Sequence, residues 1–164
     1  MKKLLTKIFE TINKELLAFV ITCFLIIIDQ ISKYLAVLYK ASLYPPLEIF
    51  SWLNIVYVEN KGISFGILST LNISFYLGLL SFVVSFYIIY LLKKSKKKAE
   101  KIALSLILGG ALGNGIDRVV REYVIDFIDI SLNNMHWPAF NIADSSITVG
   151  GILYFWLIIF KKNQ

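Results

Sequence analysis

The chain has 164 residues, of which 57% are hydrophobic, and its mean hydropathy is +0.70. Soluble domains are only about 45–50% apolar, so this composition excludes an ordinary water-soluble domain and indicates a protein of the lipid bilayer. The net charge of +6 does not indicate a nucleic-acid partner, because the lysines lie in short clusters between apolar segments, where they would orient the chain in a membrane.

Four apolar segments are long enough to cross a bilayer, whose hydrocarbon core of about 30 Å needs roughly 20 helical residues. We therefore expect an all-α membrane protein that forms a single domain over residues 1–164. The predicted parts, in chain order, are a basic amphipathic segment at 1–15 and membrane spans at about 16–39, 71–92, 102–120 and 141–160. Between the first two spans, apolar and polar residues alternate over 47–70, which predicts a small β-like segment on the outer membrane face.

The basic residues predict the direction of the four spans. Lysines precede the first span, link the second to the third at 93–98, and follow the fourth at 161–162. With four spans, all three clusters lie on one side of the membrane, which the positive-inside rule makes the cytoplasmic side. We therefore expect a multi-pass protein with both termini in the cytoplasm and with the links 40–70 and 121–140 outside.

Polar side chains interrupt the outer ends of the first and third spans, where ionisable groups are costly and are therefore candidate functional groups. Asp29 and Lys33 are four residues apart and share a helix face; an internal ion pair and a direct contact with substrate are both open. Asn114 and Arg118 share a face in the same way, and the planar fork of arginine suits a carboxylate or an exposed backbone carbonyl. We interpret Asp117 as the counter-ion of a nearby cation.

A third polar cluster surrounds the start of the fourth span. Pro138 interrupts the chain there, so the helix is expected to begin near Asn141, a favoured N-cap residue, with Asp144 in its first turn. The helix dipole alone would account for Asp144. If Asp126 converges with it in a partly dry site, however, one carboxyl group can stay ionised while the other holds a proton. Such a pair can activate a water molecule against an amide carbonyl.

Other catalytic chemistries fit the sequence less well. Residues 62–66 match the G-x-S-x-G pattern of serine hydrolases, but that motif needs a strand–turn–helix setting and a histidine base, so we interpret its glycines as turn residues. A Ser–Lys catalytic dyad of Ser32 and Lys33 is also disfavoured, because the side chains of adjacent helical residues diverge. Cys23 lies too deep in the membrane to meet His136, the only histidine. Because these two residues form no ligand cluster, we expect neither a metal nor a cofactor.

Five motifs, in order along almost the whole chain, resemble those of the bacterial type II lipoprotein signal peptidases. They are Asp-Gln-Ile-Ser-Lys at 29–33, Asn-Lys-Gly-Ile-Ser-Phe-Gly at 60–66, Gly-Asn-Gly-Ile-Asp-Arg at 113–118, Val-Ile-Asp-Phe at 124–127 and Phe-Asn-Ile-Ala-Asp-Ser at 140–145. The resemblance implies an intramembrane aspartyl endopeptidase of the bacterial plasma membrane. Such an enzyme removes the signal peptide of a prolipoprotein by cutting before a cysteine that carries a diacylglyceryl group.

The resemblance also implies roles for individual residues. Asp126 and Asp144 match the catalytic pair of the family. The residues that match its substrate-binding and active-site groups are Asn60, Gly62, Asn114, Arg118, Asn141, Asp29 and Lys33. The implied partners are the lipid-modified prolipoprotein and membrane lipids, and we expect a monomer.

The sequence departs from the family pattern at three positions. Ile63 and Ser64 replace two alanines, which affects the expected shape of the substrate groove, and Glu122 replaces a glycine before Asp126. The alternative function is a small proton-coupled transporter that uses Asp29 or Asp144 as its proton carrier. Transporter sites lie near the membrane midplane between repeats, whereas the carboxylates here are expected near one membrane face.

Overall fold

The computed structural model describes residues 2–62, 73–133 and 135–161, with side chains from residue 12 to 160 within those ranges. Its elements in chain order are α1 (Lys2–Leu38), the 3-10 helix η1 (Lys40–Leu43), β1 (Leu47–Phe50), β2 (Leu53–Asn60), α2 (Ser74–Lys94), α3 (Lys98–Arg121), β3 (Val124–Leu132), β4 (Met135–His136) and α4 (Ile142–Lys161). In the described part of the chain, four helices are long and apolar enough to cross a membrane. The predicted four-span helical fold is confirmed at this level.

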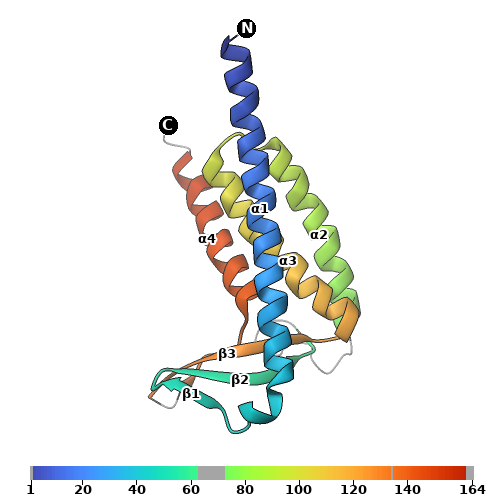
Figure 1. The fold of residues 1–164 in the computed structure, drawn as a ribbon, viewed down its shortest axis with the longest axis vertical. Helices are drawn as coiled ribbons and strands as arrows, with labels where there is room; N and C mark the ends of the chain where they lie inside the picture. The colour runs from blue at the N-terminus through green and yellow to red at the C-terminus, as the bar shows by residue number, and fades with distance from the viewer. Residues whose placement is uncertain (1, 63–72, 134, 162–164) are drawn as a thin grey trace.

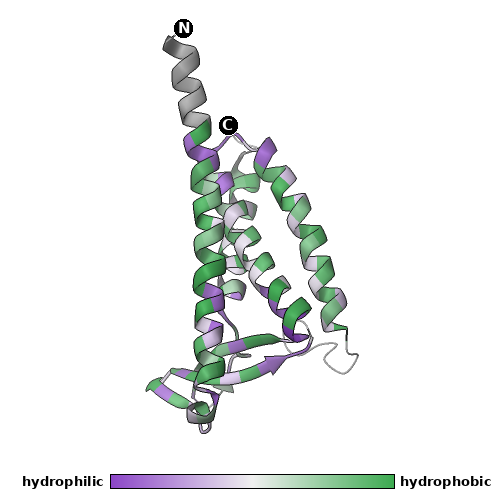
Figure 2. Cartoon of the chain, turned by 45° about the vertical axis from the view of Figure 1, so that its right-hand side comes forward, coloured by the Kyte–Doolittle hydropathy of each residue, from purple (hydrophilic) through white to green (hydrophobic). Residues whose placement is uncertain are grey.

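The helices form a bundle in which α3 is the central member (Figure 1). In α3, 61% of the most apolar stretch is buried, against 17–22% in the other three helices. Glycines allow neighbouring helices to approach α3 closely, because a Cβ atom at Gly109 would lie 2.8 Å from Leu25 Cβ and one at Gly113 would lie 2.7 Å from Asp29 Oδ2. The other helices expose large apolar side chains such as Phe19, Phe86 and Phe155. Hydrophobic residues accordingly predominate along the coloured parts of α1 and α2 (Figure 2).

A four-stranded antiparallel sheet in the order β1-β2-β3-β4 covers one end of the bundle (Figure 1). The start of α1 and the end of α4 lie at the opposite end. The strands β1 and β2 confirm the β-like segment predicted after the first span, although residues 63–72 of that prediction lie outside the described part. The pairing of β2 with β3 joins Asn60 to Val124 and Val58 to Asp126.

The basic segment 1–15 is continuous with the first span, because α1 runs without interruption from Lys2 to Leu38. The strand β3 was not predicted, since it buries polar Asp126 and Asp129 as well as apolar Val124 and Ile125 and so lacks the polar–apolar alternation of a strand with one wet face. Its partner β2 lies more than 60 residues earlier in the chain.

Candidate active site

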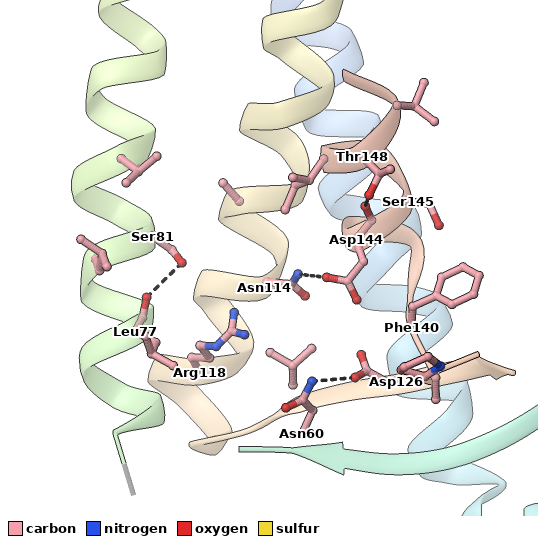
Figure 3. Close-up of a pocket in the computed structure, with 18 of the residues that line it drawn as sticks. Asn60, Leu77, Ser81, Asn114, Arg118, Asp126, Phe140, Asp144, Ser145 and Thr148 are labelled. Atoms are coloured by element: carbon pink, nitrogen blue, oxygen red, sulfur yellow. Dashed lines mark hydrogen bonds between the residues drawn. The ribbon is translucent and has the colours of Figure 1, made fainter. Parts of the chain in front are cut away.

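A cavity of about 690 Å³ opens between α2, α3 and α4, next to the sheet (Figure 3). Its end at the sheet is polar, and its deeper part between the helices is mostly apolar. The polar end contains Asn60, Asn114, Arg118, Asp126 and Asp144. The deeper wall contains Leu80, Val84, Ala111, Ile147 and Val149. The predicted carboxylates therefore meet where a polar surface adjoins an apolar groove.

Asp126 lies on β3 and is only 2% exposed. Two side-chain amides hold its carboxyl group: Asn60 Nδ2 donates to Oδ2 at 3.0 Å, and Asn141 Nδ2 donates to Oδ1 at 2.7 Å. Burial, together with the nearby charge of Asp144, raises the pKa of Asp126 to about 6, although the two amide donors oppose this shift. Asp126 is thus a carboxyl group that can hold a proton at mildly acidic pH.

Asp144 lies in the first turn of α4, as the sequence predicts. Its backbone N–H donates to Asn141 Oδ1 at 2.9 Å, while the backbone N–H of Asn141 donates to Asp144 Oδ2 at 3.3 Å. This reciprocal pair has the pattern of a capping box, which fixes both side chains at the start of a helix. Asn114 Nδ2 also donates to Asp144 Oδ1, at 2.7 Å.

Asn141 connects the two carboxylates, because its side-chain amide contacts Asp126 and its backbone N–H contacts Asp144. Figure 3 shows the two carboxyl groups turned toward one another across the cavity. Since Asn141 is fully buried, its orientation is fixed by the protein and not by solvent. The two aspartates therefore form one unit, with amide groups on both sides.

Lys33 lies behind this unit and is fully buried. Its Nζ atom is 2.8 Å from Asp29 Oδ2, 2.8 Å from Asp117 Oδ2 and 2.9 Å from Asn114 Oδ1. An ammonium group can only donate hydrogen bonds, so the atom of Asn114 that faces it must be the oxygen. The amide nitrogen of Asn114 is then left to face Asp144.

Asp29 ties α1 to the start of α4, because its Oδ1 atom accepts a hydrogen bond of 2.9 Å from the backbone N–H of Ala143. Neither Asp29 nor Lys33 lines the cavity. Asp117, interpreted from the sequence as a counter-ion, contacts both Lys33 and Arg121. Lys33 thus has a second carboxylate partner in addition to Asp29, which the sequence did not indicate.

Arg118 lines the polar end of the cavity and contacts Gly62. Arg118 Nη2 donates to the carbonyl oxygen of Gly62 at 3.1 Å, and the backbone N–H of Gly62 donates to Asn60 Oδ1 at 3.0 Å. This second bond orients the amide of Asn60 so that its nitrogen faces Asp126. The buried Nε atom of Arg118 has no hydrogen-bond partner among the described residues. Residues 63–66 of the serine-hydrolase pattern lie outside the described residues.

Two polar cavity residues, Ser81 and Thr148, were not singled out from the sequence. Thr148 follows Asp144 by four residues, so helical spacing could have placed it on the same face. His136, the only histidine of the chain, lies outside this cavity, and its Nδ1 atom is 2.9 Å from Asp129 Oδ2. Glu122, which departs from the family pattern, adopts a left-handed conformation with φ of 62°, where a glycine is favoured.

Comparisons with known proteins agree on one family. The family model described as signal peptidase (SPase) II matches residues 21–160. The lipoprotein signal peptidase of Thermodesulfovibrio yellowstonii is 45% identical over 82% of this chain and 89% of its own length. That of Anaplasma phagocytophilum is 38% identical over 93% of this chain and 97% of its own length. A solved structure described as a bacterial membrane enzyme has a TM-score of 0.76 and 33% identity, covering 90% of each chain.

Proposed function

Because the chain belongs to the signal peptidase II family, whose members are aspartic peptidases that cleave signal peptides from prolipoproteins, we propose that Asp126 and Asp144 are its catalytic pair. The observation that carries this assignment is that both carboxyl groups line one cavity and share Asn141 as a neighbour. Each is also held by a further amide, from Asn60 and Asn114 respectively.

In the proposed reaction, the two carboxyl groups divide the proton transfers between them. Asp126, whose pKa burial raises to about 6, donates its proton to the carbonyl oxygen of the scissile peptide bond. Asp144 removes a proton from a water molecule, whose oxygen attacks the carbonyl carbon. When the tetrahedral intermediate collapses, Asp144 passes that proton to the leaving nitrogen and Asp126 recovers its own. Protonation states suited to both steps are what a coupled carboxyl pair supplies.

The groups at the polar end of the cavity are placed to hold the substrate backbone. A peptide bond cannot be cut while it is part of a helix, and its freed N–H and C=O groups need partners inside a membrane. The Nε atom of Arg118, which has no hydrogen-bond partner in the part of the chain that the structure describes, is one donor for a substrate carbonyl. We assign Asn60, Gly62, Asn114 and Asn141 to the support of this region through the hydrogen bonds described above. We assign Asp29 and Lys33 to the buried cluster behind these residues, where Lys33 contacts Asn114.

The apolar part of the cavity suits the lipid-modified part of the substrate. It lies between α2 and α4, which both pack on α3, and includes Leu80 and Val84 of α2 with Ile147 and Val149 of α4. A prolipoprotein that is anchored in the bilayer by its signal helix and diacylglyceryl group can approach such a groove sideways. We therefore propose that the cleaved bond lies before the diacylglyceryl-modified cysteine.

We also infer that the enzyme works in the bacterial plasma membrane with both termini in the cytoplasm and the sheet on the outer face. The lysines at 93–98 link α2 to α3 at the bundle end opposite the sheet (Figure 1), as the positive-inside rule requires for this orientation. A cysteine placed at position 96, in a variant without Cys23, should resist a membrane-impermeant thiol reagent in intact cells. Labelling from outside would reverse the orientation.

We propose a monomeric, single-domain enzyme, because one chain supplies every named group of the site, from α1, β2, α3, β3, α4 and the residues that adjoin β2 and α4. The direct test of the function uses purified protein and a diacylglyceryl-modified prolipoprotein. Mass spectrometry should find a new N-terminal cysteine that carries the lipid. The same prolipoprotein with an unmodified cysteine serves as the control. Cleavage at another bond, or equal cleavage of both substrates, would contradict the proposed specificity.

A further inference from the structure

A second cavity, of about 540 Å³, lies at the end of the bundle opposite the sheet, between α1 and the start of α3. Its walls contain Asn13, Lys14, Leu16, Leu17, Val20 and Lys98. None of these residues lines the cavity that contains Asp126 and Asp144. The feature is therefore separate from the catalytic site in both position and composition.

The polarity of this second cavity changes along α1. The membrane-spanning part of α1 begins at Ile12, so Asn13 and Lys14 lie at its end, and Leu16, Leu17 and Val20 follow toward the bilayer centre. At a rise of about 1.5 Å per residue, Val20 lies roughly 10 Å deeper than Asn13. A polar group at the membrane surface followed by an apolar segment of this depth is the profile of a phospholipid. Leu16 and Val20 are 56% and 51% exposed in the isolated chain, so a lipid chain can reach them.

The two lysines give the cavity a positive charge. Among the residues whose side chains are described, neither Lys14 nor Lys98 forms an ion pair. Two carboxylates in this part of the chain have other partners: Glu15 contacts Lys101 at 2.6 Å, and Glu100 accepts a hydrogen bond of 2.7 Å from Ser95. An occupant with a negative charge near the membrane surface would complement this arrangement.

We propose that this cavity binds an anionic phospholipid. Lys14 and Lys98 contact the phosphate, the side-chain amide of Asn13 donates to the headgroup, and one acyl chain lies along Leu16 and Val20. A basic residue near an anionic membrane surface contributes about 1 kcal/mol. Removal of both lysines should therefore weaken binding about 30-fold, since each tenfold corresponds to about 1.4 kcal/mol.

The test is a titration of the full-length protein in neutral detergent with dioleoyl phosphatidylglycerol, followed by native mass spectrometry. The variant Lys14→Gln/Lys98→Gln should bind this lipid about 30-fold more weakly than the parent. The matched control is Lys93→Gln/Lys96→Gln, which removes the same charge from exposed lysines outside the cavity and should bind like the parent. Dioleoyl phosphatidylcholine, which has the same chains and no net charge, should bind weakly to all three proteins.

Thermal unfolding in phosphatidylcholine first verifies that the variants are folded. If the double variant does not fold, Lys98→Gln alone should still weaken binding about fivefold, because Lys98 is exposed. Equal losses in the cavity and control variants would show general charge attraction and overturn the proposal. Equal binding of phosphatidylcholine would also overturn it. Displacement of the lipid by inorganic phosphate at comparable concentrations would identify a free-phosphate site instead.

Discussion

Replacement of Lys33 by methionine should remove the cation that neutralises two buried carboxylates. Lys33 Nζ lies 2.8 Å from both Asp29 and Asp117, and all three residues are at most 1% exposed. Loss of one partner from a buried ion pair costs about 3–5 kcal/mol, because the remaining charge stays desolvated. Here two carboxylates remain, with Arg121 as the only other cation in contact with either among the described residues. We therefore expect Lys33→Met to lower the free energy of unfolding by at least about 3–5 kcal/mol.

Asp29→Asn should be milder for two structural reasons. Lys33 keeps Asp117 as a partner, and an asparagine oxygen can still accept the hydrogen bond from the backbone N–H of Ala143. The loss should approach that of one hydrogen bond to a charged group, about 1.5–3 kcal/mol. The double variant Asp29→Asn/Lys33→Met should be more stable than Lys33→Met alone, because it leaves one unneutralised carboxylate fewer.

The single cysteine, Cys23, allows this series to be measured. It is partly buried in α1, so a thiol-reactive dye should report its exposure on heating. For a protein of this length, a loss of about 3–5 kcal/mol lowers Tm by about 6–20 °C. If Lys33→Met unfolds at the parent temperature, or if Asp29→Asn is the more damaging change, the charge balance inferred for this cluster is wrong.

Three further predictions concern Asp126, Arg118 and the residue Glu122 that precedes β3. The kcat/KM for prolipoprotein cleavage should fall as pH rises through about 6, because Asp126 then loses the proton that it donates. A kcat/KM that keeps rising from pH 6 to 8 would contradict this role. Arg118→Lys should lower kcat/KM about 10- to 100-fold with little change in Tm, because the compact ammonium of lysine cannot occupy the positions of both Nη2, which bonds to Gly62, and Nε. Near-normal cleavage would reduce Arg118 to a counter-ion. Glu122→Gly should raise the free energy of unfolding by up to about 1 kcal/mol, because glycine adopts the left-handed backbone conformation without the steric cost of a Cβ atom. A lower Tm would show that the Glu122 side chain has a stabilising contact.

The fold was predictable where the signal lies in a single apolar segment. The four spans follow from hydropathy alone, because a helix in lipid satisfies its own backbone and needs no information about its neighbours. β3 was not predictable in this way, since its partner β2 is distant in the chain and its polar residues face a buried site. Pairing between strands that are far apart depends on tertiary packing, which local patterns do not encode.

The candidate site shows the same limit. The spacing of Asp29 and Lys33 on one helix indicated an ion pair, because that relation is local. No spacing indicated that Asp117, on α3, would also contact Lys33, or that Lys33 would orient the amide of Asn114. These contacts depend on how closely α1 approaches α3 at Gly113. Asn141 was predicted as an N-cap, whereas its bridging position between Asp126 and Asp144 required the structure.

The most direct measurement of the proposed catalytic pair compares Asp126→Asn and Asp144→Asn with the parent enzyme. Asparagine keeps the size and much of the hydrogen bonding of aspartate but cannot exchange a proton in this range. Each variant should therefore fold and bind the lipidated prolipoprotein while its kcat falls by orders of magnitude. The double variant should be scarcely slower than either single one, because residues that act as a unit are not additive. Substantial cleavage by Asp144→Asn, together with its abolition in Ser64→Ala, would contradict the assignment and favour a serine mechanism.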